Sequence, residues 1–73
     1  MPIPKIIEEL FGARYDWQMA AFDEKAKMQS RFETLRSQAA KEYQCSEMEL
    51  WLAAGKHYRA WVRQNKLPQP PKE

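Results

Sequence analysis

Apolar side chains near the start of the chain recur at the three- and four-residue spacing of a helix that buries one face. Pro4 stands where the first turn of a helix tolerates proline, and Gly12 stands where a C-terminal cap favours glycine. The apolar face between them consists of Ile6, Ile7, Leu10 and Phe11. This pattern predicts a short N-terminal helix between Pro4 and Gly12.

A second apolar stripe extends over residues 17–43 and keeps one helical phase throughout. At about 100° per residue, its members fall within an arc of roughly 80°. They are Trp17, Ala21, Met28, Phe32, Leu35, Ala39 and Tyr43. The stripe predicts one long central helix, with Asp16 as its N-cap. Met19, Phe22 and Ala26 form a second apolar patch, which we expect the short first helix to cover.

The length of this central helix leaves two alternatives open. A continuous helix over 17–43 would measure about 40 Å, whereas a compact domain of this size has a radius of gyration of about 11 Å. Either the helix breaks, with Asp23 as a second N-cap, or its far end packs on another chain. Both a monomer and a homodimer are therefore expected possibilities.

The third helix has the clearest start in the sequence. Ser46-Glu47-Met48-Glu49 is a capping box, in which the serine and the second glutamate each satisfy a free backbone N–H of the first turn. The apolar face that follows consists of Leu50, Trp51, Ala54, His57, Tyr58, Trp61 and Val62. We expect this helix to run to about Lys66, before Pro68 stops it.

A short turn at Gln44-Cys45 would pack the second and third helices together as an antiparallel hairpin. The side chains expected to form the main core of that hairpin are Phe32, Leu35, Trp51, Tyr58 and Trp61. The alternative is that the three aromatic residues of the third helix are exposed platforms for unpaired bases. Their common phase with Leu50 and Val62 favours the core.

Glycine and proline are placed as a helical chain requires. The two glycines are at 12 and 55, and the five prolines, at 2, 4, 68, 70 and 71, leave more than sixty residues uninterrupted. The sequence therefore predicts an all-α fold, a small three-helix domain over 1–66 with a Pro-rich flexible tail over 67–73. Within the tail, Pro68-Gln69-Pro70-Pro71 also fits a Pro-x-x-Pro ligand.

Charge is distributed unevenly along the chain, although the net charge is only +2. Residues 1–50 hold seven Lys/Arg against nine Asp/Glu, a balance of −2, and residues 51–73 hold five against one, a balance of +4. Four of these cations lie at three- and four-residue spacing on the face opposite the apolar one: Lys56, Arg59, Arg63 and Lys66. The spacing predicts a basic helix face for an anionic partner, with a solvated face favoured by the helix dipole as the alternative.

The residues that carry chemistry are few. One cysteine, Cys45, and one histidine, His57, are too few for a zinc site, and no acid–base pair, nucleophile or phosphate-binding loop accompanies them. We expect no enzyme activity, no catalytic residue, no metal and no cofactor. The single cysteine and the lack of a signal-like apolar run predict a cytoplasmic location. No apolar run approaches the roughly 18 residues of a membrane span, so no membrane partner is expected.

Residues 37–57 resemble a helix-turn-helix motif, without resembling any particular family. A small residue, an apolar residue, a turn residue, a cap and a core residue fall at the required places: Ala40, Tyr43, Cys45, Ser46 and Leu50. The pattern departs from the motif at Gln44, where glycine is usual, and at Glu47 and Glu49, which would face phosphates. An ordinary helical hairpin with the same spacing is the alternative.

Two functions follow from these features. The first is a small non-enzymatic regulator or adaptor that docks through its basic helix face on a larger protein complex, such as transcription machinery with RNA polymerase. The second is a DNA-binding transcription regulator of the helix-turn-helix type. The two acids at the start of the third helix favour the first. Small chains of this kind occur among phage regulators, which is an analogy only.

Overall fold

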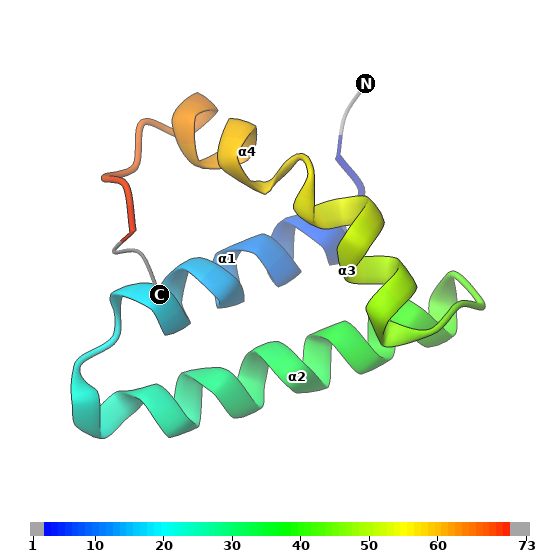
Figure 1. Cartoon of the computed structure of the whole chain (residues 1–73), viewed down its shortest axis with the longest axis horizontal. Helices are drawn as coiled ribbons and strands as arrows, with labels where there is room; N and C mark the ends of the chain where they lie inside the picture. The colour runs from blue at the N-terminus through cyan, green and yellow to red at the C-terminus, as the bar shows by residue number, and fades with distance from the viewer. Residues whose placement is uncertain (1–2, 71–73) are drawn as a thin grey trace.

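The computed structural model describes residues 3–70 as an arrangement of helices without strands. The helices are α1 (Lys5–Met19), α2 (Lys25–Glu42), α3 (Glu47–Gly55) and α4 (Tyr58–Gln64), with the short 3-10 helix η1 (Phe22–Glu24) before α2. Figure 1 shows α1 and α2 side by side and antiparallel, with α3 rising from the end of α2 and α4 returning over α1. The all-α prediction is confirmed, whereas the predicted division into three helices is wrong.

The first helix is longer than predicted, because Gly12 lies inside it and does not end it. α1 continues for two more turns to Met19, and Ala20 then adopts an extended backbone, with ψ of 146°. Leu10, Phe11 and Ala13 are all buried, so packing on both sides of the glycine outweighs its low helix propensity. Asp16 lies within α1 and is not an N-cap; its carboxylate is 3.4 Å from an Arg31 nitrogen.

The long central helix predicted over 17–43 is broken at Ala20 and Ala21, where the backbone is extended. The alternative of a break is therefore the one observed. Asp23 does not cap the following helix, since the N-cap of α2 is Glu24 and no side chain accepts a hydrogen bond there. Because the chain reverses, Trp17 packs on Phe32 across the hairpin, with ring centroids 5.6 Å apart.

The second apolar patch predicted in this region is not covered by the first helix. Phe22 is 94% exposed and Met19 is 46% exposed, and Ala26 is also exposed. These residues lie at or beside the corner between α1 and α2, on the side away from the core. The prediction was wrong because Met19 belongs to the first helix, as its last residue, and the chain changes direction directly after it.

The predicted third helix is divided at Lys56 and His57 into α3 and α4. Its start is as predicted, because the Glu49 backbone N–H donates to Ser46 Oγ at 3.1 Å. Its end is earlier than predicted, at Gln64 rather than Lys66. After the change of direction between α3 and α4, Tyr58 packs on Phe11 of α1, and both Tyr58 and Val62 are buried.

The core is centred on the first helix rather than on a hairpin of the second and third. Phe11 is 1% exposed, and its ring lies 5.5 to 6.2 Å, between centroids, from those of Trp51, Tyr58 and Trp61. The Tyr58 hydroxyl also donates to Gln18 Oε1 at 2.5 Å, which ties α4 to α1. The aromatic residues of α3 and α4 are therefore core residues, as predicted, but Phe11 had not been expected at their centre.

Two of the predicted core residues, Phe32 and Tyr58, are buried. The other predicted members are partly buried and pack against the core: Leu35, Trp51 and Trp61. The fully buried side chains also include Leu10 and Val62.

Residues 67–70 have no regular secondary structure, and the first two of them contact the domain. The Tyr15 hydroxyl donates to the Pro68 carbonyl oxygen at 2.9 Å, and Leu67 packs against the core. In Figure 1 this segment descends from the end of α4 towards the end of α1. The flexible tail was predicted over 67–73, and its last part, 71–73, lies outside the described residues.

Candidate partner-binding surface

The four predicted site residues are all exposed, but they do not lie on one continuous helix face. Lys56 lies in the turn between α3 and α4, Arg59 and Arg63 lie four residues apart on α4, and Lys66 follows its C-terminus. We call these four residues the basic surface. None of them forms an ion pair with a carboxylate of residues 3–70, where the ion pairs are Arg31–Asp16 and Arg36–Glu47.

Lys66 is held in a left-handed backbone conformation, with φ of 55°. Its backbone N–H donates to the Arg63 carbonyl at 3.0 Å, and the Leu67 N–H donates to the Val62 carbonyl at 3.1 Å. These two hydrogen bonds form a Schellman motif, which ends α4 and directs Leu67 back to the core. The motif fixes the backbone from which the Lys66 side chain projects.

The turn between α2 and α3 ends α2 in the same way. Gln44 has φ of 55°, its N–H donates to the Lys41 carbonyl at 3.2 Å, and the Cys45 N–H donates to the Ala40 carbonyl at 3.0 Å. Gln44 thus adopts the backbone for which glycine is usual in this turn. Ala40 and Leu50 are buried on either side of it, as the spacing of the helix-turn-helix motif requires.

The acids at the start of α3 differ in their surroundings. Glu47 Oε1 lies 3.4 Å from Arg36 Nε, which links α3 to α2. The Glu49 side chain is exposed, and the half of the capping box that the structure shows is the hydrogen bond from the Glu49 N–H to Ser46 Oγ. The negative charge at this end of α3 is therefore only partly offset.

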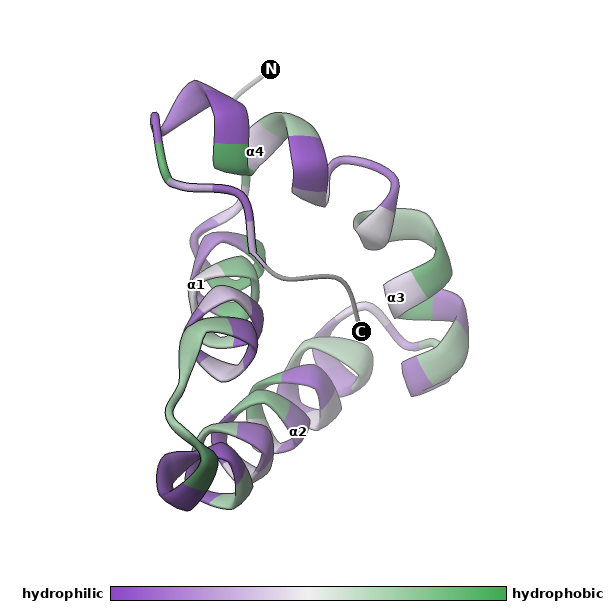
Figure 2. Cartoon of the chain, turned by 60° about the vertical axis from the view of Figure 1, so that its left-hand side comes forward, coloured by the Kyte–Doolittle hydropathy of each residue, from purple (hydrophilic) through white to green (hydrophobic). Residues whose placement is uncertain are grey.

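The outer face of α3 carries two large apolar side chains that the sequence reasoning missed. Met48 is 75% exposed and Leu52 is 64% exposed. They are four residues apart and thus neighbours on the helix, on the side opposite Leu50 and Ala54. Figure 2 shows how little of α3 beyond its acidic first turn is hydrophilic. The signal was present in the sequence, since both residues fall outside the predicted apolar face of the third helix.

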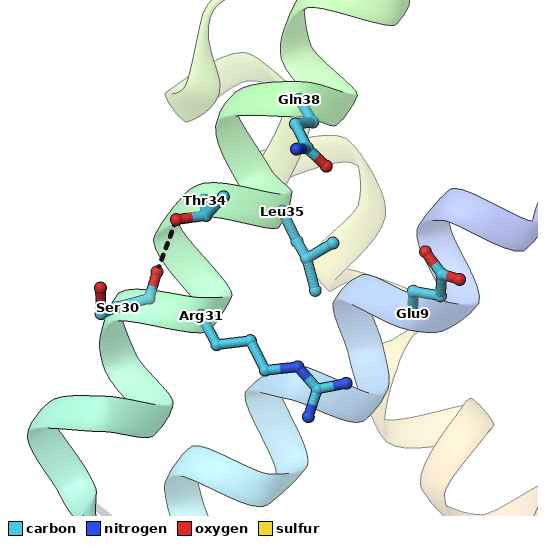
Figure 3. A pocket seen from close by; sticks show the side chains of 6 residues that line it. All are labelled: Glu9, Ser30, Arg31, Thr34, Leu35 and Gln38. Atoms are coloured by element: carbon cyan, nitrogen blue, oxygen red, sulfur yellow. Dashed lines mark hydrogen bonds between the residues drawn. The ribbon is translucent and has the colours of Figure 1, made fainter.

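A groove of about 390 Å³ lies between α1 and α2 and was not predicted. Its lining, drawn in Figure 3, is Glu9 from α1 and Ser30, Arg31, Thr34, Leu35 and Gln38 from α2. Leu35 is the single apolar member, whereas sites for small organic ligands are mostly apolar. The Thr34 hydroxyl is engaged with the Ser30 carbonyl at 3.0 Å, and Arg31 with Asp16. The groove therefore offers little apolar surface to a small organic ligand, and the polar groups of Thr34 and Arg31 are already held by neighbours.

No known protein family matches the chain, and no curated protein or solved structure matches it at a significant level. Within residues 3–70, no group of three potential metal-ligating side chains is close enough to hold an ion. None of the helices described is both long and apolar enough to cross a membrane.

Proposed function

We propose that this protein is a small non-enzymatic regulator or adaptor, which docks on a larger protein complex through the basic surface. The observation that carries this proposal is the exposure of all four cations, none of them paired with a carboxylate of residues 3–70. Uncompensated positive charge gathered in one segment attracts an acidic partner and increases the rate of encounter with it. Acidic surfaces of transcription machinery, such as RNA polymerase, are partners of the required chemistry.

The second candidate function is DNA binding of the helix-turn-helix type. It is favoured by the left-handed Gln44 and by the burial of Ala40 and Leu50 at the turn. The outer face of α3 argues against it, because a recognition helix reads base edges with hydrogen-bonding side chains. Here that face carries Met48 and Leu52, which lack such groups.

The two candidates are separated by affinity capture from host lysate, with and without nuclease treatment. We expect a captured protein that survives nuclease and is lost when all four residues of the basic surface are changed to glutamine. A matched control replaces Lys27 and Lys41, exposed cations of α2, and should capture the same protein. The captured protein is then purified and its binding measured directly with the same variants.

The DNA alternative predicts instead that capture is lost on nuclease treatment. It also predicts duplex binding whose logarithmic affinity falls with log salt at a slope of about −3 to −4, if all four cations contact phosphates. Changing Glu47 and Glu49 to glutamine should then tighten duplex binding. Equal capture by the parent and the quadruple variant would refute both functions of the basic surface.

A further inference from the structure

The apolar side chains on the outside of α3 are not used by the fold. Leu50, Trp51 and Ala54 are the residues of this helix that pack in or against the core. Met48 and Leu52 lie on the side opposite Leu50 and Ala54 and are 75% and 64% exposed. We call this pair the apolar ridge. Two large neighbouring side chains left in water on so short a helix are a feature of interaction sites rather than of folding.

The apolar ridge leads into the basic surface. Lys56 follows Leu52 by four residues, and its backbone keeps the right-handed helical conformation, with φ of −58° and ψ of −29°. Lys56 therefore extends the line of Met48 and Leu52 by one more turn. Arg59 follows three residues later, after the change of direction into α4. The apolar ridge and the positive charge of Lys56 are thus adjacent on one side of α3.

We propose that the apolar ridge and the basic surface form one docking surface, and that its occupant is an acidic amphipathic helix of a partner protein. This inference rests on the proposed function and adds the chemistry of the partner. Apolar side chains of that helix cover Met48 and Leu52, and its carboxylates lie over Lys56 and Arg59. Charge complementarity selects an acidic occupant, and the ridge selects an apolar stripe on it.

The same surface also sets the direction of the occupant. Glu49 is exposed at the start of α3, while the cations lie at and beyond its end. An acidic helix therefore places its most acidic end over α4 and its less acidic end near Glu49. A nucleic acid makes poor use of this surface, because phosphates gain nothing from Met48 or Leu52 and are repelled by Glu49.

Synthetic peptides of about 18 residues, about five helical turns, test this inference. One carries a leucine stripe flanked by glutamates, a second carries the same stripe flanked by lysines, and a third has glutamates without the stripe. Binding to the full chain is measured by NMR titration of backbone amides up to about 1 mM peptide, the range of weak recognition. We expect the first peptide to bind most tightly and to shift the amides of Met48, Leu52 and Lys56.

A protein variant with Met48→Gln and Leu52→Gln should bind the first peptide at least about ten-fold more weakly, since burying one large apolar side chain is worth roughly one to two decades in Kd. The matched control is Phe22→Gln, which removes a still more exposed apolar side chain at the corner between α1 and α2 and should leave Kd unchanged. The far-ultraviolet circular dichroism of both variants should match the parent, because both sites are on the surface.

Three results would overturn the inference. The first is that the glutamate-flanked and lysine-flanked peptides bind equally well, or that neither binds. The second is that Phe22→Gln weakens binding of the first peptide as much as the Met48→Gln, Leu52→Gln variant does. The third is that the Met48→Gln, Leu52→Gln variant binds the first peptide with the affinity of the parent. If that variant loses nothing while the quadruple variant of the basic surface loses binding, the proposed function stands and the apolar ridge has no part in it. Loss in neither variant would remove both.

Discussion

Replacing Gln44 by glycine should make the protein more stable, although glycine usually weakens helical chains. Gln44 has φ of 55° in the turn that ends α2. A residue with a Cβ costs about 1 to 2 kcal/mol in this conformation, whereas glycine adopts it freely. Glycine also gains entropy in the unfolded chain, which offsets about 0.5 to 1 kcal/mol of that benefit. The net stabilisation expected for Gln44→Gly is about 0.5 to 1 kcal/mol.

Thermal unfolding followed by far-ultraviolet circular dichroism measures this change. For a domain of this size, 1 kcal/mol corresponds to about 4 to 8 °C, so the Tm should rise by about 2 to 8 °C. Urea titration should show a higher midpoint with an unchanged slope, because the surface exposed on unfolding stays the same. Lys66→Gly should act similarly, since Lys66 has the same φ and ends α4 with the same pair of hydrogen bonds.

Two controls separate the conformational effect from other effects of glycine. Gln44→Ala keeps the Cβ and should leave the Tm within a few degrees of the parent. Gln38→Gly, at an exposed position inside α2, should cost about 1 kcal/mol, the usual helix penalty. If Gln44→Gly melted at or below the parent while Gln38→Gly showed its loss, the left-handed assignment of the turn would be refuted.

Three further changes test the core and the caps. Phe11→Ala should lower the free energy of unfolding by about 3 to 5 kcal/mol, which is comparable with the whole stability of so small a domain. The variant should therefore be unfolded by circular dichroism, and a folded variant with an unchanged Tm would contradict the central position of Phe11. Tyr58→Phe should lose the hydrogen bond to Gln18 and cost about 0.5 to 1.5 kcal/mol in urea unfolding, with no loss if that bond is absent in solution. Ser46→Ala should cost about 0.5 to 2 kcal/mol while Ser46→Asp keeps the cap, so equal stability of the two would argue against capping.

Local signals in the sequence predicted the helical class and one boundary correctly. Ser46 caps α3 because a hydroxyl at that position satisfies a free N–H, which depends only on the residues of the first turn. The two breaks were not predictable in this way. Ala20 and Ala21 are good helix formers but have extended backbones, and Lys56 and His57 include no helix breaker either. The first turn lets Trp17 pack on Phe32, the second lets α4 pack on Phe11, and both contacts are tertiary.

The residues of the basic surface were named from the sequence, but their arrangement on two helices was not. Lys56, Arg59, Arg63 and Lys66 were identified from spacing on one uninterrupted helix, and they are exposed as expected. Their arrangement differs because α3 and α4 are separate helices. The apolar ridge was not predicted, although Met48 and Leu52 fall outside the predicted apolar face of the third helix, and the extent of their exposure depends on how α3 packs.

The position of Phe11 in the sequence has a consequence for synthesis of the protein on the ribosome. Its ring partners in α3 and α4 lie between 40 residues (Trp51) and 50 residues (Trp61) further along the chain. The hairpin of α1 and α2 therefore leaves the ribosome before the residues of α3 and α4 that cover Phe11. Until then Phe11 is open to solvent, a state in which nascent chains attract chaperones or aggregate. We expect the native core to close only after Trp61 has left the ribosome.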